Sequence, residues 1–313
     1  MKRFLKYFSV MLAFILVLTG CNAPKVTKKS AKEKLTDSVE KSEKVTNFSE
    51  KVTVSLNFDQ DGKTNSVSST VEGKVYTEGD NTLMYADVKA SAAGQSMGGT
   101  LYADITKESA KLYVNYMGTW LKADTSILGD TYKEVISKVE ANKISSKEIM
   151  EYAKEVKEDK TDDQGYTSYL VTLDKEKLNK KFYETLQKSM EETKKLEGFD
   201  EEDKAEMDKK LEEYKNGIFS NDLTITVYVK DGYFAGCFID IKQIVDNVLP
   251  NVKDAETVNQ IKSMNLSGAI TVVMSDFNKV EKIVIPAEAQ NGTDIMTLLG
   301  STTSENVAVQ NNQ

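Results

Sequence analysis

The sequence predicts an α+β protein in which helices pack against one face of a single large, curved antiparallel sheet. Three observations lead to this fold class. Apolar and polar residues alternate with a period of two over residues 52–58, 112–116 and 223–229, as in strands with one buried face. The turn signals between these strands are short, and short turns favour antiparallel pairing. The intervening residues have helical spacing, so helices are expected to cover the sheet.

The chain begins with the features of an export signal. Lys2, Arg3 and Lys6 precede an apolar run over residues 8–18. A run of this length is too short to cross a bilayer comfortably, and its flanks are those of a cleaved signal rather than of a transmembrane helix. We therefore expect residues 1–20 to be removed on export. An uncleaved anchor is the alternative.

The signal ends in Leu18, Thr19, Gly20 and Cys21. These four residues resemble the lipobox of bacterial lipoproteins. The resemblance implies that the Cys21 thiol carries a diacylglyceryl group and that Cys21 is the first residue of the mature protein. It also implies a partner, the cell membrane, and a location on the outer face of the cytoplasmic membrane, in the cell envelope.

Residues 21–46 are interpreted as a lipidated, solvated stem, because they are rich in lysine and poor in large apolar residues. Leu35, Val39 and Val45 leave a helical stripe open as an alternative for its second half. A single domain is expected over residues 47–300, since that stretch contains no internal repeat and no Pro/Gly-rich linker. The polar residues 301–313 are expected to be a disordered tail.

The first sheet block is expected to be a meander of about six strands. Turn signals separate the strands at Asp61-Gly62, at residues 79–81 and at Gly98-Gly99. The expected strands cover residues 52–58, 67–76, 83–92, 101–105, 112–116 and 120–123.

A helical block is expected next. Apolar residues from Leu128 to Val139 share one helical face, and Ser145 with Glu148 forms a capping box for a second helix. A hairpin over residues 155–173 follows. Asp174 and Asp200 are then expected to cap two helices with densely charged outer faces.

Strands resume at residues 223–229, and Asp231-Gly232 turns the chain into residues 233–239. This last segment is apolar on both faces, so both faces must be covered by protein or by a ligand. Short helices are expected at residues 244–249 and 258–264. The last strands are expected at residues 266–274 and 283–285.

This order of elements is similar to that of the LolA/LppX-like lipoproteins, especially those of bacteria with a single membrane. The similarity rests on three segments: residues 112–122, which contain Leu-Tyr-Val and Gly-Thr-Trp-Leu-Lys, Asp276-Phe277-Asn278, and residues 283–286. It implies an incomplete barrel whose concave face, covered by helices, encloses acyl chains. The chain departs from LolA in one respect. LolA latches its lid with an arginine, whereas Arg3 is the only arginine of this chain and is expected to be lost with the signal.

Composition excludes several functions. Without residues 1–20 the chain has 38 basic and 49 acidic residues, a net charge of −11, so nucleic acid is not an expected partner. The chain has no histidine, which excludes a His-based triad and an imidazole metal site. Cys237 has no expected disulfide partner once Cys21 is lipidated. We interpret Cys237 as a small buried hydrophobe rather than a reactive thiol.

Five aromatic residues on predicted strands are candidates to line a ligand cavity, with ordinary core residues as the alternative. They are Tyr113, Trp120, Tyr228, Phe234 and Phe238. No metal site, cofactor or catalytic residue is expected. Two carboxylates could hydrolyse a glycoside without histidine, but no spacing singles out a pair, so we expect no enzyme.

Two functions remain. The protein binds a lipid or another hydrophobic ligand between sheet and helices, or it is fully packed and acts through protein–protein contacts of its acidic helices. The first is favoured because the two-sided apolar strand and the Leu- and Met-rich helix suit an adaptable apolar site.

Overall fold

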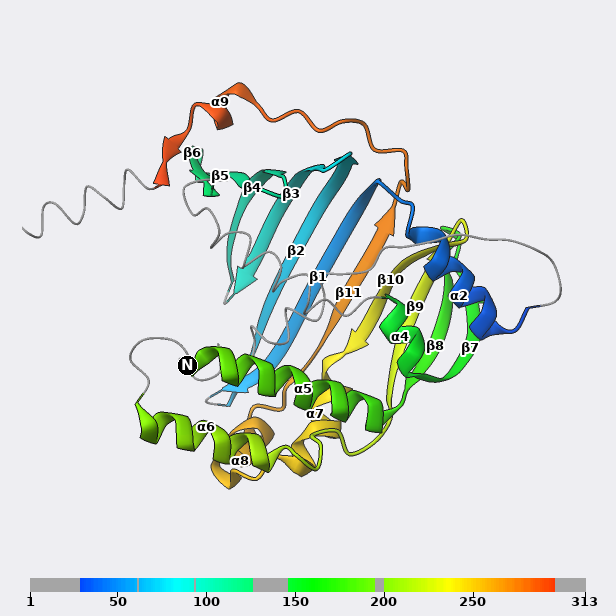
Figure 1. Cartoon of the computed structure of the whole chain (residues 1–313), viewed down its shortest axis with the longest axis vertical. Helices are drawn as coiled ribbons and strands as arrows, with labels where there is room; N and C mark the ends of the chain where they lie inside the picture. Colours follow the sequence, from blue (N-terminus) through cyan, green and yellow to red (C-terminus); the bar gives the residue numbers. More distant parts are fainter. Residues whose placement is uncertain (1–28, 61, 93, 126–145, 195–199, 296–313) are drawn as a thin grey trace, which may run out of the picture. The chain divides into compact units, whose positions relative to one another are not determined.

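The computed structural model describes residues 29–60, 62–92, 94–125, 146–194 and 200–295. These residues form an α+β protein with one large, mostly antiparallel sheet that does not close (Figure 1). The strand order is β12-β6-β5-β4-β3-β2-β1-β11-β10-β9-β8-β7. The α+β class and the antiparallel sheet are therefore confirmed.

The strands follow the alternating segments of the sequence. Their bounds are β1 Asn47–Gln60, β2 Lys63–Glu78, β3 Asn81–Ala92, β4 Gln95–Ile105, β5 Ala110–Tyr116, β6 Thr119–Asp124, β7 Ala153–Thr161, β8 Thr167–Leu173, β9 Leu223–Lys230, β10 Tyr233–Asp240, β11 Ser267–Ser275 and β12 Thr293–Asp294. The helices of the described residues are α2 Ala31–Ser42, α4 Ser146–Tyr152, α5 Lys175–Thr193, α6 Glu201–Glu213, α7 Ile241–Val248, α8 Ala255–Ser263, α9 Ala287–Gln290 and the 3-10 helix η2 Leu249–Asn251.

The chain divides into two compact units, and β1, β2 and β11 contribute residues to both. The helical unit comprises Met1–Lys44, Val54–Ser66 and Asn142–Val272. The meander unit comprises Val45–Thr53, Val67–Ala141 and Val273–Gln313. The domain expected over residues 47–300 thus contributes to both units, and each unit is described by itself.

In the helical unit, α2 packs against β7, β10 and α4. Leu35 and Val39 of α2 are buried, and the buried Ser42 hydroxyl accepts the Phe234 N–H at 2.9 Å. The second half of the expected stem is therefore a packed helix, the alternative that its apolar stripe left open. Packing prevails over the lysine-rich composition because long lysine side chains keep their ammonium groups in water beside a buried stripe.

The core of the helical unit lies on β8, β9 and β10. Strand β10 has buried residues on both of its faces, as the sequence predicts. These buried residues are 234–237 and Ile239. Asp231 and Gly232 have positive φ angles of 53° and 74°, which confirms the tight turn before β10.

Helices α5 and α6 begin where the aspartates predict. Asp174 accepts the N–H groups of residues 176 and 177, and Asp200 those of residues 202 and 203. The stripe of α5 is packed at one end only, since Leu178 is buried whereas Phe182, Leu186 and Met190 are half-buried. The α6 helix has no buried residue.

The meander unit contains β3 to β6 entire, as predicted, but one turn lies elsewhere. Gly98 and Gly99 are inside β4, and the turn before β4 contains Gly94, whose φ is +77°. A β-carbon on Gly98 would lie 2.9 Å from the Val88 carbonyl oxygen, and one on Gly99 would lie 2.6 Å from that of Asn115. The glycine pair therefore allows neighbouring strands to approach closely, and its prediction as a turn is wrong.

The strand expected at residues 283–285 is absent from the described residues. This segment has no ladder, and Val284 is 79 % exposed. Asp276 and Asn278 have φ angles of 54° and 57° and turn the chain after β11, while Pro286, which has no N–H, precedes α9. The chain then pairs β12 with β6 in parallel, so the sheet is not antiparallel throughout.

Several expectations lie outside the described residues. These are the signal and lipobox with Cys21, the helix over residues 128–139, the cap at Ser145 and the tail after residue 300. The helix that follows Ser145 is α4.

Candidate apolar ligand site

The candidate site is one face of the meander unit, and strand register defines it. Directly opposite residues of an antiparallel pair share a face, and successive residues of a strand alternate. Val71 lies opposite Val88, Ala86 opposite Leu101, and Leu101 opposite Val114. Most large side chains on this face are aliphatic, although Ser69, Thr77, Thr82 and Thr119 are among its polar members, and we call it the aliphatic face. Its large aliphatic members include Val71, Val75, Met84, Val88, Leu101, Leu112, Val114 and Leu121.

The aliphatic face is incompletely covered. Every one of these eight side chains is half-buried or exposed, and Val114 is 36 % exposed. The small residues Ala103 and Ala110 are the buried members of this face among the described residues of β2 to β6. A packed core normally buries its large aliphatic side chains. The arrangement therefore leaves apolar surface available to a ligand.

The helical unit is different. Val171 and Val227 are fully buried there, and Leu173 is 3 % exposed. These residues share a face of β8 and β9. The same residue types are thus buried on this face of β8 and β9 but half-buried or exposed on the aliphatic face, which makes the aliphatic face the candidate site.

Tyr113 and Trp120, two of the predicted cavity residues, lie on the opposite face of the meander unit. Tyr113 pairs with Tyr102 and Lys122 in the ladder and is 9 % exposed. The Tyr102 ring lies 5.2 Å from that of Tyr85 and 6.0 Å from that of Trp120. The Lys122 ammonium donates to the Gln290 carbonyl of α9 at 3.0 Å. Both predicted residues therefore belong to an aromatic cluster on the face next to α9.

The other three predicted residues are in the helical unit, where register places them on two faces. Phe234 pairs with Val229 in the ladder and is only 1 % exposed, so it is a core residue. Tyr228 pairs with Gly236, and Phe238 pairs with Thr226, which puts both on the other face of the sheet. Both are half-buried. The structure therefore brings Tyr228 and Phe238 together but separates them from Phe234.

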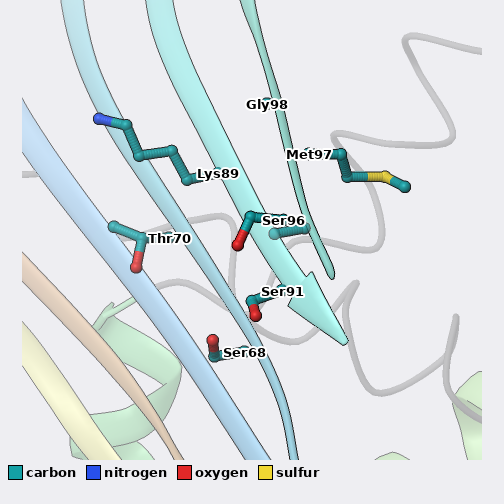
Figure 2. A pocket seen from close by; sticks show the side chains of 8 residues that line it. Ser68, Thr70, Lys89, Ser91, Ser96, Met97 and Gly98 are labelled. Atoms are coloured by element: carbon teal, nitrogen blue, oxygen red, sulfur yellow. The ribbon is translucent and has the colours of Figure 1, made fainter. Parts of the chain in front are cut away.

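A shallow polar groove of about 370 Å³ lies on the face opposite the aliphatic one. Ser68, Ser91 and Ser96 form one row across β2, β3 and β4, and Lys89 lies in the next row. Figure 2 shows Met97 directed away from Ser96 and Lys89. The Lys89 ammonium already pairs with the Asp87 carboxylate at 2.6 Å, so its charge is neutralised within the protein. The groove is therefore a weaker candidate than the aliphatic face.

The titratable groups near these surfaces do not suggest acid–base chemistry. Burial raises the pKa of the Tyr102 and Tyr228 phenols, and the pKa of Tyr169 rises to about 12 for the same reason. These phenols stay neutral at physiological pH. In the described ranges no three acidic or cysteine side chains gather as a metal site would require. Among the same residues, no helix combines the length and hydropathy needed to span a bilayer.

Comparison with known proteins gives no assignment: no protein-family model matches the chain, and no curated protein sequence matches it.

The side chains of the aliphatic face alternate with polar ones in the sequence, although none of them is among the five predicted cavity residues. In β3 and β5, Met84, Val88, Leu112 and Val114 alternate with tyrosine, lysine and aspartate. The five predicted cavity residues are aromatic, because aromatic side chains contribute the largest apolar area per residue. Only strand register shows that these aliphatic side chains share one face.

Proposed function

We propose that the protein is a lipoprotein, anchored through Cys21 to the outer face of the cytoplasmic membrane, that binds a lipid or another hydrophobic molecule on the aliphatic face. One observation carries the proposal: no large side chain on this face is fully buried among the described residues of β2 to β6. A partly exposed apolar surface made of several neighbouring side chains is typical of a binding site. A LolA-like incomplete barrel, with helices over its concave face, is the fold that we propose for this function.

The chemical class of the ligand follows from the side chains of the aliphatic face. The large side chains that line it over five strands are mostly aliphatic, which suits acyl or alkyl chains better than flat aromatic ligands. Methionine and valine side chains contact such chains through dispersion forces without directional requirements. The site is therefore expected to accept several chain types.

The test pairs two substitutions with similar exposure. Val114→Asn places an amide on the aliphatic face, whereas Leu170→Asn places one on β8 of the helical unit, where Leu170 is 39 % exposed. Affinity for the apolar fluorophore N-phenyl-1-naphthylamine is measured for both variants and the parent. Val114→Asn should weaken binding about tenfold, because covering an unpaired amide with an apolar ligand costs about 1–2 kcal/mol. Leu170→Asn should change it less than about twofold.

Mass spectrometry of organic extracts from natively purified protein complements the titration. Recovery of acyl-chain lipids supports the proposal. Equal responses of the two variants, or no bound fluorophore and no apolar extract, would contradict it.

A second function has one observation in its favour. The thirteen residues of α6 include no buried one, so this acidic helix is available for contacts with an envelope protein. Crosslinking in cells that recovers a stoichiometric partner through α6, from protein that binds no fluorophore, would favour this alternative.

A further inference from the structure

A single carboxylic acid extends onto the aliphatic face from the neighbouring strand β1. The ammonium of Lys51 pairs with the Glu72 carboxylate at 2.5 Å, and Glu72 lies opposite Asp87 on the polar face. Because side chains alternate along a strand, the residue before Lys51 belongs to the aliphatic face. That residue is Glu50, and its nearest neighbours on the same side of β1 are Phe48 and Val52.

The neighbouring strand β2 places a glycine, which has no side chain, next to Glu50. Gly73 of β2 lies next to Glu50, since a β-carbon added to Gly73 would come within 4.0 Å of the Glu50 carbonyl oxygen. Gly73 lies opposite Ala86, another small residue of the aliphatic face. The flanking residues of β2 on this face are Val71 and Val75, which supply neither charge nor hydrogen bonds. The Glu50 side chain therefore stands beside small and aliphatic residues only on the β2 side.

Glu50 has no hydrogen-bond or ion-pair partner among the described residues. Lys51, the nearest cation along the strand, is held by Glu72 on the other face. Burial raises the pKa of the Glu50 carboxyl, and no nearby charge counteracts this. Apolar surroundings disfavour an unpaired carboxylate. The described residues supply no partner that offsets the cost of desolvating the Glu50 carboxylate.

We propose that Glu50 is a specificity-determining residue that pairs with the ammonium group of a cationic amphiphile whose alkyl chain lies on the aliphatic face. This inference rests on the proposed function and adds the charge of the ligand to it. Charge-assisted hydrogen bonds to a desolvated carboxylate are the strongest that a buried glutamate forms. A long-chain amine satisfies both requirements, since its chain matches the aliphatic side chains and its head matches Glu50. An anionic head would be repelled, and a hydroxyl head would be held more weakly.

The experiment compares three probes with the same chain, namely dodecylamine, dodecanol and dodecanoate. Each displaces N-phenyl-1-naphthylamine at neutral pH from the full mature chain, below the critical micelle concentration of the probe. The parent protein should bind dodecylamine at least tenfold more tightly than dodecanol, and dodecanoate most weakly. Glu50→Gln keeps the shape of the side chain and should reduce the amine preference to about twofold or less. Glu50→Leu should do the same.

Glu72→Gln is the matched control, because this glutamate is on the adjacent strand but on the opposite face. It should leave the amine preference unchanged. Equal affinity of the parent protein for all three probes, or the same amine preference in Glu50→Gln, overturns the role of Glu50 while leaving the apolar site intact. If neither the fluorophore nor any probe binds, the proposed function fails and the role of Glu50 fails with it.

Discussion

Replacing one leucine in each unit measures how tightly the aliphatic face is packed. Leu173 is 3 % exposed in the helical unit, and Leu101 is half-buried on the aliphatic face. Leu173→Ala should lower the free energy of unfolding by about 3 kcal/mol, the usual cost of a buried leucine truncation with its residual cavity. Leu101→Ala removes a side chain that is only partly out of water and leaves no closed cavity. Its expected cost is therefore about 1 kcal/mol.

Urea denaturation of delipidated protein provides the assay. The single tryptophan, Trp120, reports the meander unit by fluorescence, and far-UV circular dichroism reports the whole chain. The Leu101→Ala variant should also bind N-phenyl-1-naphthylamine several-fold more weakly than the parent, whereas Leu173→Ala should bind it normally at low urea. A cost of about 3 kcal/mol for Leu101→Ala, with unchanged fluorophore affinity, would show that the aliphatic face is solidly packed and would refute the reasoning.

Three further predictions test other parts of the structure. Cys21→Ser should abolish incorporation of labelled palmitate, while Cys237→Ser should retain it; labelling that survives Cys21→Ser would contradict the anchor. Ser42→Ala removes the acceptor of the buried Phe234 N–H and should lower the free energy of unfolding in urea by about 1–3 kcal/mol. The control Ser263→Ala, at an exposed position, should lower it by less than about 0.5 kcal/mol. Equal losses in the two variants would argue against a packed α2. Glu50 has a folded-state pKa above its ordinary 4.5, so its contribution to stability is complete below pH 4.5 and is lost as the pH rises through the folded-state value. Glu50→Gln should therefore gain stability relative to the parent between pH 4 and pH 8, and a difference that does not vary with pH would contradict the burial of Glu50.

The candidate site was harder to predict than the fold. Tyr113, Trp120 and Phe234 were sensible candidates, because large aromatic side chains on strands commonly line apolar sites. Register shows Tyr113 and Trp120 on the face that carries the aromatic cluster, and Phe234 is packed beneath α2. The sequence does not single out Glu50 as a site residue, since it is one of 49 acidic residues and its spatial neighbours are not known from the sequence.

Local sequence patterns by themselves determined the kinds of elements and their order in this protein. Period-two alternation and short turn signals predicted β1 to β6, β9 and β10, and Asp174 and Asp200 predicted the starts of α5 and α6, because backbone hydrogen bonding and capping depend on nearby residues. The tertiary structure alone decided that residues 31–42 pack as α2, that Gly98 and Gly99 lie within β4, and which side chains share a face. These outcomes depend on contacts between residues far apart in the chain, and a shift of one residue in register would exchange the two faces of a strand.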